Sequence, residues 1–220
     1  MNIAVVGTGY VGLVTGTCFA ETGNNVICVD INEKKVESLK NGKIPIFEPG
    51  LDMLFERNTK EGRLHFTTNL SEAVSQSQII FLALPTPPGE DGSADLSYIM
   101  GVARDLSRII TDYKVIVDKS TVPVGTSEKV TAIISEKLST DLFDVVSNPE
   151  FLREGVAVED FMKPDRVVIG TESERARKVM RLLYEPFVRQ GNPIYFMDER
   201  SAEMTKYAAN SYLAARITFM

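Results

Sequence analysis

Cysteine and histidine are scarce in this sequence of 220 residues, which contains two cysteines and one histidine. So few thiols and imidazoles exclude a disulfide framework and a Cys/His zinc cluster, and we expect no metal site. His65 is the one candidate for a histidine base, but it lies in a short strand-like run, where a structural role is expected. Cys18 and Cys28 are flanked by apolar residues, as is typical of small buried thiols in a reducing compartment.

An excess of basic residues and long apolar runs are missing as well. Lysine and arginine total 24 against 30 aspartates and glutamates, which gives a formal charge of -6 at pH 7. That balance argues against nucleic acid or an anionic membrane surface as the main partner. We see no basic leader and no apolar run long enough to span a bilayer. We therefore expect a cytoplasmic protein that binds neither nucleic acid nor a membrane.

The sequence does contain a regular alternation of apolar, β-branched runs with longer stretches of helical period. Near-continuous apolar runs are typical of strands covered on both faces, as in a parallel sheet. The expected strands are 3–6, 26–29, 64–67, 79–84, 115–117, 143–146, 167–169 and 194–196. The expected helices are 10–22, 33–41, 50–60, 95–111, 126–138, 173–185 and 200–219. This alternation predicts an α/β fold with a doubly wound, mostly parallel sheet.

The last predicted helix suggests how the chain is divided. Residues 201–220 have helix-forming composition, contain neither glycine nor proline, and end without a C-cap signal. We interpret residues 1–199 as a Rossmann-like domain and 200–220 as the start of a long connecting helix. On this interpretation the sequence is cut within an element.

A Gly-x-Gly-x-x-Gly motif at residues 7–12 lies between the first predicted strand and helix. Gly7 permits the tight turn, Gly9 lets the backbone approach a pyrophosphate, and Gly12 lets the helix pack on the strand. The N–H groups and positive dipole end of the helix then face the phosphates. The alternative is a glycine-rich turn without a ligand.

The second predicted strand ends at Asp30. In dinucleotide-binding folds the acid that binds the ribose lies about 20 residues beyond the glycines, and Asp30 is close to that position. Its carboxylate can accept hydrogen bonds from ribose hydroxyls and would repel a 2′-phosphate. This favours NAD over NADP as the cofactor, although Lys35 could offset the repulsion.

Three further polar segments follow predicted strands, at residues 84–88, 120–126 and 148–155. Ligands of open α/β sheets bind in the crevice outside the carboxyl ends of the strands. We therefore expect these loops to converge on the cofactor. The alternative for each is turn chemistry, in which proline fixes the backbone and serine or threonine caps the next helix.

Two pairs of polar residues have a spacing of four. Glu150 and Glu154 would share a face if they lie on a helical turn, and in a cleft one carboxylate could act as a general base. Lys206 and Asn210 repeat the spacing in the last predicted helix, where an ammonium and an amide could stabilise an oxyanion. Either pair could instead be ordinary surface residues.

The order of these segments is familiar. Residues 148–155 read Asn-Pro-Glu-Phe-Leu-Arg-Glu-Gly, and residues 164–170 read Pro-Asp-Arg-Val-Val-Ile-Gly. With the glycine motif and residues 84–88, 120–126 and 203–211, they occur as in nucleotide-sugar dehydrogenases. The chain resembles the UDP-glucose/GDP-mannose dehydrogenase family over its whole length, and within it most closely the members that act on UDP-glucose.

The resemblance implies a Rossmann-like NAD-binding domain in an oxidoreductase that converts the C6 alcohol of UDP-glucose to the carboxylate of UDP-glucuronate with two NAD molecules. That reaction belongs to nucleotide-sugar metabolism and serves polysaccharide biosynthesis. In such enzymes a cysteine traps the aldehyde as a thiohemiacetal, a second hydride transfer gives a thioester, and water hydrolyses it. The resemblance also implies a homodimer formed through the central helix.

Roles for individual residues follow from the resemblance. The cofactor would be bound by Gly7, Gly9, Tyr10, Val11, Gly12, Asp30, Lys35, Thr86, Thr121 and Glu154. The nucleotide-sugar substrate would be contacted by Glu150, Phe151, Leu152, Arg153, Glu154, Lys206 and Asn210. The catalytic residues would be Thr121 and Glu154, which position a water, Glu150, which assists thioester hydrolysis, and Lys206 and Asn210, which stabilise oxyanions at C6.

The sequence departs from the family in one respect. The nucleophilic cysteine of the family lies in a Gly-Gly-Ser-Cys-like segment, and the 220 residues contain no such segment. We therefore expect the chain alone to be inactive. Three alternatives stay open: a dehydrogenase of GDP-mannose or of an N-acetylated UDP-sugar, a β-hydroxyacid dehydrogenase, and a stand-alone dinucleotide-binding module.

Overall fold

The computed structural model describes residues 1–189 and 191–220. Within these residues the chain forms one eight-stranded sheet in the order β3-β2-β1-β4-β5-β6-β7-β8. The strands are β1 Asn2–Val6, β2 Asn25–Val29, β3 Leu64–Thr67, β4 Ile79–Leu82, β5 Lys114–Asp118, β6 Phe143–Ser147, β7 Val167–Gly170 and β8 Ile194–Met197. The predicted doubly wound sheet is thereby confirmed.

The direction of the strands is parallel from β3 to β6, as the apolar runs predict. The sheet reverses once, where β6 meets β7 in an antiparallel pair through Ser147 and Gly170. The chain leaves β1 toward β2 and β3 on one side and returns through β4 to the other side. The carboxyl ends of β1 and β4 therefore flank the point where the strand order reverses, which is where ligands of such sheets bind.

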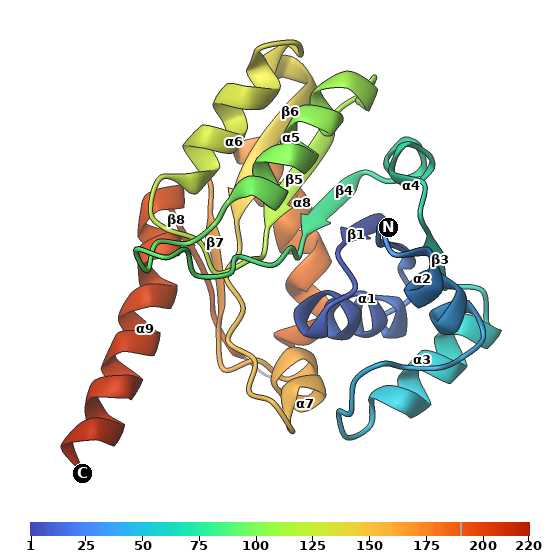
Figure 1. Ribbon diagram of the computed structural model, residues 1–220, viewed down its shortest axis with the longest axis horizontal. Coiled ribbons are helices and arrows are strands. Elements are labelled where there is room, and N and C mark those ends of the chain that lie inside the picture. Colours follow the sequence, from blue (N-terminus) through green and yellow to red (C-terminus); the bar gives the residue numbers. More distant parts are fainter. Residues whose placement is uncertain (190) are drawn as a thin grey trace.

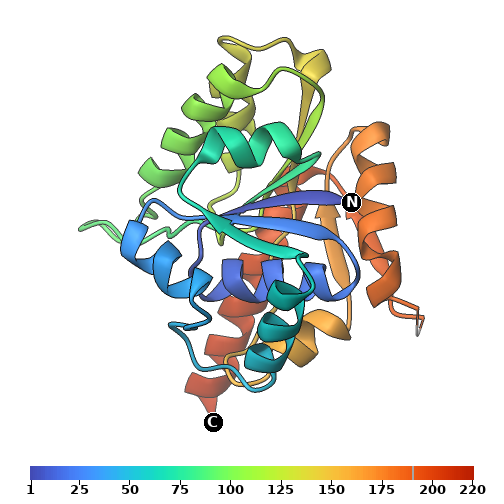
Figure 2. The ribbon, with the colours of Figure 1, turned by 90° about the vertical axis from the view of Figure 1, so that its right-hand side faces the viewer.

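Helices cover both faces of the sheet (Figures 1 and 2). In Figure 2 α5 and α6, coloured green to yellow, lie above the strands, and α1 in blue lies below them. The α-helices are α1 Tyr10–Glu21, α2 Glu33–Lys40, α3 Leu51–Lys60, α4 Leu70–Gln76, α5 Ser97–Ile109, α6 Thr126–Ser135, α7 Ala157–Met162, α8 Glu174–Tyr184 and α9 Glu199–Phe219. Short 3-10 helices cover Thr140–Leu142 and Glu185–Phe187.

The hydrophobic core consists of two layers because side chains alternate across a strand. In β1, Ile3 and Val5 face the layer beneath α1, whereas Ala4 and Val6 face the layer beneath α5. The layer beneath α1 contains an aromatic cluster around Phe19, whose ring centroid lies 4.9 Å from that of Phe81. Phe161, Tyr184 and Phe187 complete the cluster. The two layers cover both faces of β1, whose carboxyl end carries the glycine loop.

Every predicted strand and helix is present, with its ends shifted by at most a few residues. Two helices were not predicted, α4 and α7. Both are short: α4 is capped by the Asn69 side chain, which accepts from the Glu72 N–H, and α7 has six residues. Segments of this length hold too few apolar positions to display a helical period.

The helix α9 leaves the body of the protein (Figure 1). Its buried residues are Ala202, Glu203 and Lys206, all in its first half. A Cβ atom on Gly170 would lie 2.5 Å from the Cβ of Ala202, so glycine in β7 is what allows α9 to approach the sheet. Among the described residues, no helix has the length and apolar content required to cross a membrane.

Candidate functional site

The glycine motif forms the turn between β1 and α1. Gly7 has a φ of +101°, and a Cβ atom there would lie 2.2 Å from the carbonyl oxygen of Ala83. A Cβ atom on Gly12 would lie 2.0 Å from the carbonyl oxygen of Gly7, whereas one on Gly9 would meet no described atom within 4 Å. Gly7 and Gly12 are therefore required by packing, while Gly9 leaves open space beside the backbone, which fits the close approach of a pyrophosphate.

The helix α1 presents its positive end at this turn. Gly9 is the N-cap residue and has no side chain that could accept from the N–H groups of the first turn. Its carbonyl oxygen accepts the hydrogen bond from the Leu13 N–H at 2.9 Å. The free N–H groups and the helix dipole together favour an anion, as phosphate-binding helix ends do.

The Asp30 carboxylate is held at the end of β2. Its Oδ2 atom accepts from the Thr8 hydroxyl at 2.5 Å and from the Lys35 ammonium at 2.9 Å, and its Oδ1 atom accepts from the Asn32 N–H at 3.1 Å. Desolvation by burial raises the pKa of Asp30, but these hydrogen bonds outweigh it, so the pKa lies below its usual value. Asp30 is therefore a fixed anion that can still accept from ribose hydroxyls.

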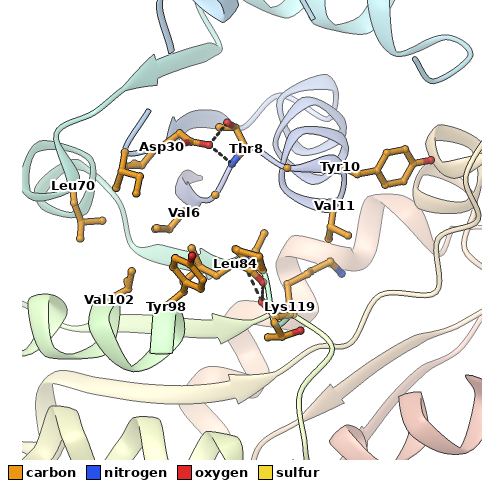
Figure 3. A pocket seen from close by; sticks show the side chains of 18 of the residues that line it. Val6, Thr8, Tyr10, Val11, Asp30, Leu70, Leu84, Tyr98, Val102 and Lys119 are labelled. Atoms are coloured by element: carbon orange, nitrogen blue, oxygen red, sulfur yellow. Dashed lines mark hydrogen bonds between the residues drawn. The ribbon is translucent and has the colours of Figure 1, made fainter. Parts of the chain in front are cut away.

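A cavity of about 810 Å³ runs along the carboxyl ends of β1 and β4 (Figure 3). Asp30 and Lys35 line one end, and Thr121 and Glu150 line the other. The volume lies in the range of about 300–1,000 Å³ that is typical of pockets for small molecules and cofactors. The cavity therefore extends from the expected ribose-binding acid to the expected reaction centre.

Part of the cavity wall was not predicted from the sequence. Leu70 at the start of α4 and Tyr98 and Val102 of α5 line it, and Figure 3 shows them across the cavity from the glycine loop. These apolar residues suit an aromatic ring such as adenine. Thr8 of the glycine motif and Ser120 of segment 120–126 line the cavity as well. No motif marks Leu70, Tyr98 and Val102, because their positions depend on which helix face meets the sheet.

The loops after β4 and β5 are tied together beside the cavity. The Thr86 hydroxyl donates to the carbonyl oxygen of Thr121 at 3.0 Å, and the Leu84 N–H donates to the Ser120 hydroxyl oxygen at 3.0 Å. Thr86 and Thr121 both line the cavity. Thr86 and Thr121 can therefore stabilise the turns and also contact a ligand.

Glu150 and Lys206 form a buried ion pair at the far end of the cavity. The Lys206 ammonium lies 3.0 Å from Glu150 Oε1, and the side chains are 10% and 12% exposed. Glu150 Oε2 accepts from the Leu152 N–H at 2.9 Å. Lys206 is held in place one turn earlier in α9, because the buried Glu203 carboxylate accepts from the N–H groups of Gly125 and Ser127 at 2.6 and 2.8 Å.

The segment that contains Glu150 is not a helical turn. The residues that follow β6 form a loop, so Glu150 and Glu154 do not share a helical face. Glu154 and Asn210 are exposed, and neither lines the cavity along β1 and β4. Their catalytic and binding roles stay predictions. Arg153 is also exposed and forms an ion pair with Asp160 at 2.6 Å.

Glu48 connects the glycine motif to the loop after β6, although no sequence motif marks it. This carboxylate is 4% exposed. It accepts from the Tyr10 hydroxyl, from the Gly155 N–H at 2.8 Å and from the Ala157 N–H at 2.7 Å. Tyr10 also lines the cavity, and its side chain points away from Asp30 (Figure 3). The buried Glu48 carboxylate thus joins the glycine motif to the segment that follows β6.

A second cavity of about 410 Å³ adjoins the first and shares Lys119 and Glu150 with it. Its other lining residues include Phe151, Leu152 and Arg166, and the Arg166 guanidinium lies 4.3 Å from the Phe151 ring centroid. Lys119 and Glu150 therefore lie where a ligand in the first cavity would meet a ligand in the second.

The two cysteines are buried in the core, as their apolar neighbours predict. Cys18 in α1 and Cys28 in β2 are both fully buried and free. Burial raises the pKa of Cys28 to about 12 and that of Cys18 even further. Because the thiolate is the reactive form, burial and a raised pKa both disfavour these cysteines as nucleophiles.

Replacing Asp30 by alanine tests the cofactor end of the cavity. NAD should bind the unmutated chain more tightly than NADP, and Asp30→Ala should narrow the difference by about 1–3 kcal/mol, the usual value of a hydrogen bond to a charged group. Isothermal titration calorimetry with both cofactors measures this difference. Lys34→Ala, at an exposed neighbour in α2, is the matched control. Equal affinity of the unmutated chain for NAD and NADP would show that Asp30 does not select the cofactor through its ribose hydroxyls.

Comparison with known proteins places this geometry in a family. Residues 1–188 match the model of the UDP-glucose/GDP-mannose dehydrogenase family, NAD binding domain. The chain is 50% identical to a UDP-glucose 6-dehydrogenase of Rhizobium meliloti, with all of this chain and 51% of the relative covered. The chain therefore spans about half the length of the curated relatives it matches.

Solved structures share the fold. A ternary complex of GDP-mannose dehydrogenase from Pseudomonas aeruginosa superimposes with a TM-score of 0.94 at 36% identity, covering 100% of this chain and 51% of that one. A UDP-glucose dehydrogenase from Pyrobaculum islandicum gives 0.93 at 43% identity, covering 99% and 50%. With the fit of the glycine turn, Asp30 and the crevice to a dinucleotide, these matches confirm the predicted cofactor. The chain belongs to the UDP-glucose/GDP-mannose dehydrogenase family, and its cofactor is NAD.

Proposed function

We propose that the chain is the NAD-binding half of an enzyme that oxidises the C6 alcohol of UDP-glucose to the carboxylate of UDP-glucuronate. The observation that carries the proposal is the buried ion pair between Lys206 and Glu150, 3.0 Å apart at the end of the cofactor cavity. Glu150 lines both cavities, so a ligand in the second cavity would bring its reactive carbon next to this pair. The names of the curated relatives support UDP-glucose as that ligand.

The chemistry assigns distinct roles to the two charges. NAD, when bound, accepts the hydride that leaves C6. The Lys206 ammonium donates a hydrogen bond to the C6 oxygen and stabilises the negative charge that develops there as the C6 hydroxyl proton passes to a water molecule. The Glu150 carboxylate accepts the proton of the water that hydrolyses the acyl intermediate. Thr121, which lines the same end of the cavity, would hold that water.

The acyl intermediate needs a thiol from outside this chain. Because Cys18 and Cys28 are buried and protonated, we propose that a further segment of the full-length enzyme supplies the nucleophile. We also propose the division of the chain at residue 200, with residues 1–199 as the cofactor domain and 200–220 as the start of a connecting helix.

The assembly and setting of the enzyme are proposals too. The second half of α9 exposes Tyr212, Leu213 and Ile217, at 67%, 57% and 70%. Exposed apolar residues on one helix mark an interaction surface, and we propose a homodimer formed through α9. Free, buried cysteines are typical of a reducing compartment, and we propose a cytoplasmic enzyme that supplies polysaccharide biosynthesis.

The stoichiometry of the reaction tests the proposed function. Conversion of one alcohol and one water to a carboxylate releases two hydrides, so the full-length enzyme should form two NADH per UDP-glucose. Chain 1–220 alone should form none in steady state. GDP-mannose and UDP-N-acetylglucosamine at equal concentration serve as competing substrates. A higher kcat/KM for either competitor would show that this competitor, and not UDP-glucose, is the substrate. Steady turnover by chain 1–220 would show that the nucleophile lies within residues 1–220.

A further inference from the structure

Lys119 is a buried cation whose contacts are all with uncharged groups. It follows β5 directly and is 5% exposed. Its ammonium donates to Asn148 Oδ1 at 3.2 Å and to the Tyr184 hydroxyl oxygen at 3.4 Å. It also lies 5.5 Å from the Phe161 ring centroid. Among the described residues it forms no ion pair.

A buried charge without a carboxylate partner is expensive, and such groups cluster at functional sites. The position of Lys119 agrees with a functional role, because it lines both cavities together with Glu150. Figure 3 shows its ammonium at the cavity edge beneath Val11. An ammonium has three N–H donors, and Asn148 and Tyr184 accept from two of them.

The surroundings hold Lys119 in one place. Asn148 Oδ1 also accepts from the Tyr184 hydroxyl at 2.5 Å, and Asn148 Nδ2 donates to the carbonyl oxygen of Val168 at 2.8 Å. The lysine is therefore tied to β7 and α8. Lys206 must break its ion pair with Glu150 before it can bind a ligand. Lys119 has no such ion pair among the described residues.

Glu150 requires a second cation nearby if Lys206 leaves it during the reaction. In the structure the Lys206 ammonium is bound to Glu150, but in the proposed reaction it must turn to the C6 oxygen. Glu150 would then be an almost buried carboxylate that has lost its partner, which is strongly unfavourable. A fixed positive charge nearby would remove most of that cost.

We propose that Lys119 is a positioning residue that balances the charge of Glu150 while Lys206 acts on the substrate oxygen. The inference rests on the proposed function of Lys206. It assigns two cations to one carboxylate, so the site keeps a net positive charge that can receive the negative oxygen. Lys119 itself acts through Glu150 and stays bound to Asn148 and Tyr184.

Turnover should depend on the charge of Lys119 and therefore on pH. Desolvation by burial lowers the pKa of Lys119 to about 8, while Glu150 raises it and Lys206 lowers it. The charged or titratable groups that face it are Glu150 from the loop after β6, Lys206 from α9 and Tyr184 from α8. Lys119 loses its charge as the pH rises through about 8, so kcat should fall there. An arginine stays charged across this range.

The first experiment compares pH profiles of the full-length enzyme. Lys119→Met should lower kcat about tenfold or more, with the KM values for NAD and UDP-glucose changed less than twofold. Lys119→Arg should restore most of kcat and move the alkaline fall to higher pH. Lys178→Arg, an exposed lysine of α8, should leave the profile unchanged. Equal profiles for the unmutated enzyme and Lys119→Arg, or a Lys119→Met effect confined to KM, would overturn the proposal.

The second experiment does not depend on activity or on arginine fitting the site. NMR titration of the Lys119 Cε signal in the unmutated protein, Glu150→Gln and Lys206→Met reports its coupling to the ion pair. Its pKa should fall in Glu150→Gln and rise in Lys206→Met. Unchanged values in both variants would overturn the proposal. A coupled Lys119 in an enzyme whose kcat is insensitive to Lys206→Ala would instead contradict the proposed function.

Discussion

Replacing Lys206 by alanine in the full-length enzyme should lower kcat by about a hundredfold to a thousandfold, the usual loss when one oxyanion donor is removed. Both oxidations and the hydrolysis pass through a negatively charged oxygen on C6, so one cation acts on each step. Interactions that form mainly in the transition state affect kcat rather than substrate binding. The KM for UDP-glucose should therefore change only modestly.

The control for this prediction is Lys178→Ala, which removes an exposed lysine of α8. It should leave kcat unchanged and alter the free energy of unfolding by less than about 0.5 kcal/mol. Steady-state NADH formation measures kcat, and thermal unfolding monitored by circular dichroism confirms that both variants fold. If Lys206→Ala and Lys178→Ala have the same kcat, Lys206 has no catalytic role.

Replacing Phe19 by alanine should lower the free energy of unfolding by about 3–5 kcal/mol, the typical cost of removing a buried phenylalanine ring. Phe19 is fully buried, and its ring centroid lies within 5.8 Å of those of Phe81, Phe161, Tyr184 and Phe187. It joins α1, which carries the glycine turn, to β4, α7 and α8. Loss of the ring leaves a cavity that these rigid elements cannot fill.

Urea unfolding of Phe19→Ala and Phe219→Ala compares the two extremes of exposure in one chain. Phe219 is 90% exposed, and its replacement should change the free energy of unfolding by less than about 0.5 kcal/mol. A loss below about 1 kcal/mol for Phe19→Ala would mean that the core beneath α1 is not as tightly packed as the ring contacts indicate.

The fold was predictable because its signals are local. Each strand is a short apolar run, and Gly12 packs against Gly7 of the same motif. Asp30 could be placed because it ends a strand in a fixed relation to the glycines. In each case a few adjacent residues determine the geometry.

The parts of the site that were not predicted depend on contacts between distant segments. Glu48 binds N–H groups more than one hundred residues away in the chain. The role inferred for Lys119 follows from its burial against Asn148 and Tyr184, which no spacing in the sequence reveals. Glu150 and Glu154 would share a face only on a helical turn, and a loop follows β6 instead.

The location of the NAD site tests the central claim most directly. Titration of chain 1–220 with NAD, followed by amide chemical shifts in NMR spectra, should give saturable changes at Gly9, Val11, Asp30 and Thr121, which line the larger cavity. Saturable changes confined to residues 151–166, which border the second cavity, would contradict the claim. So would the absence of saturable changes at the glycine turn and Asp30.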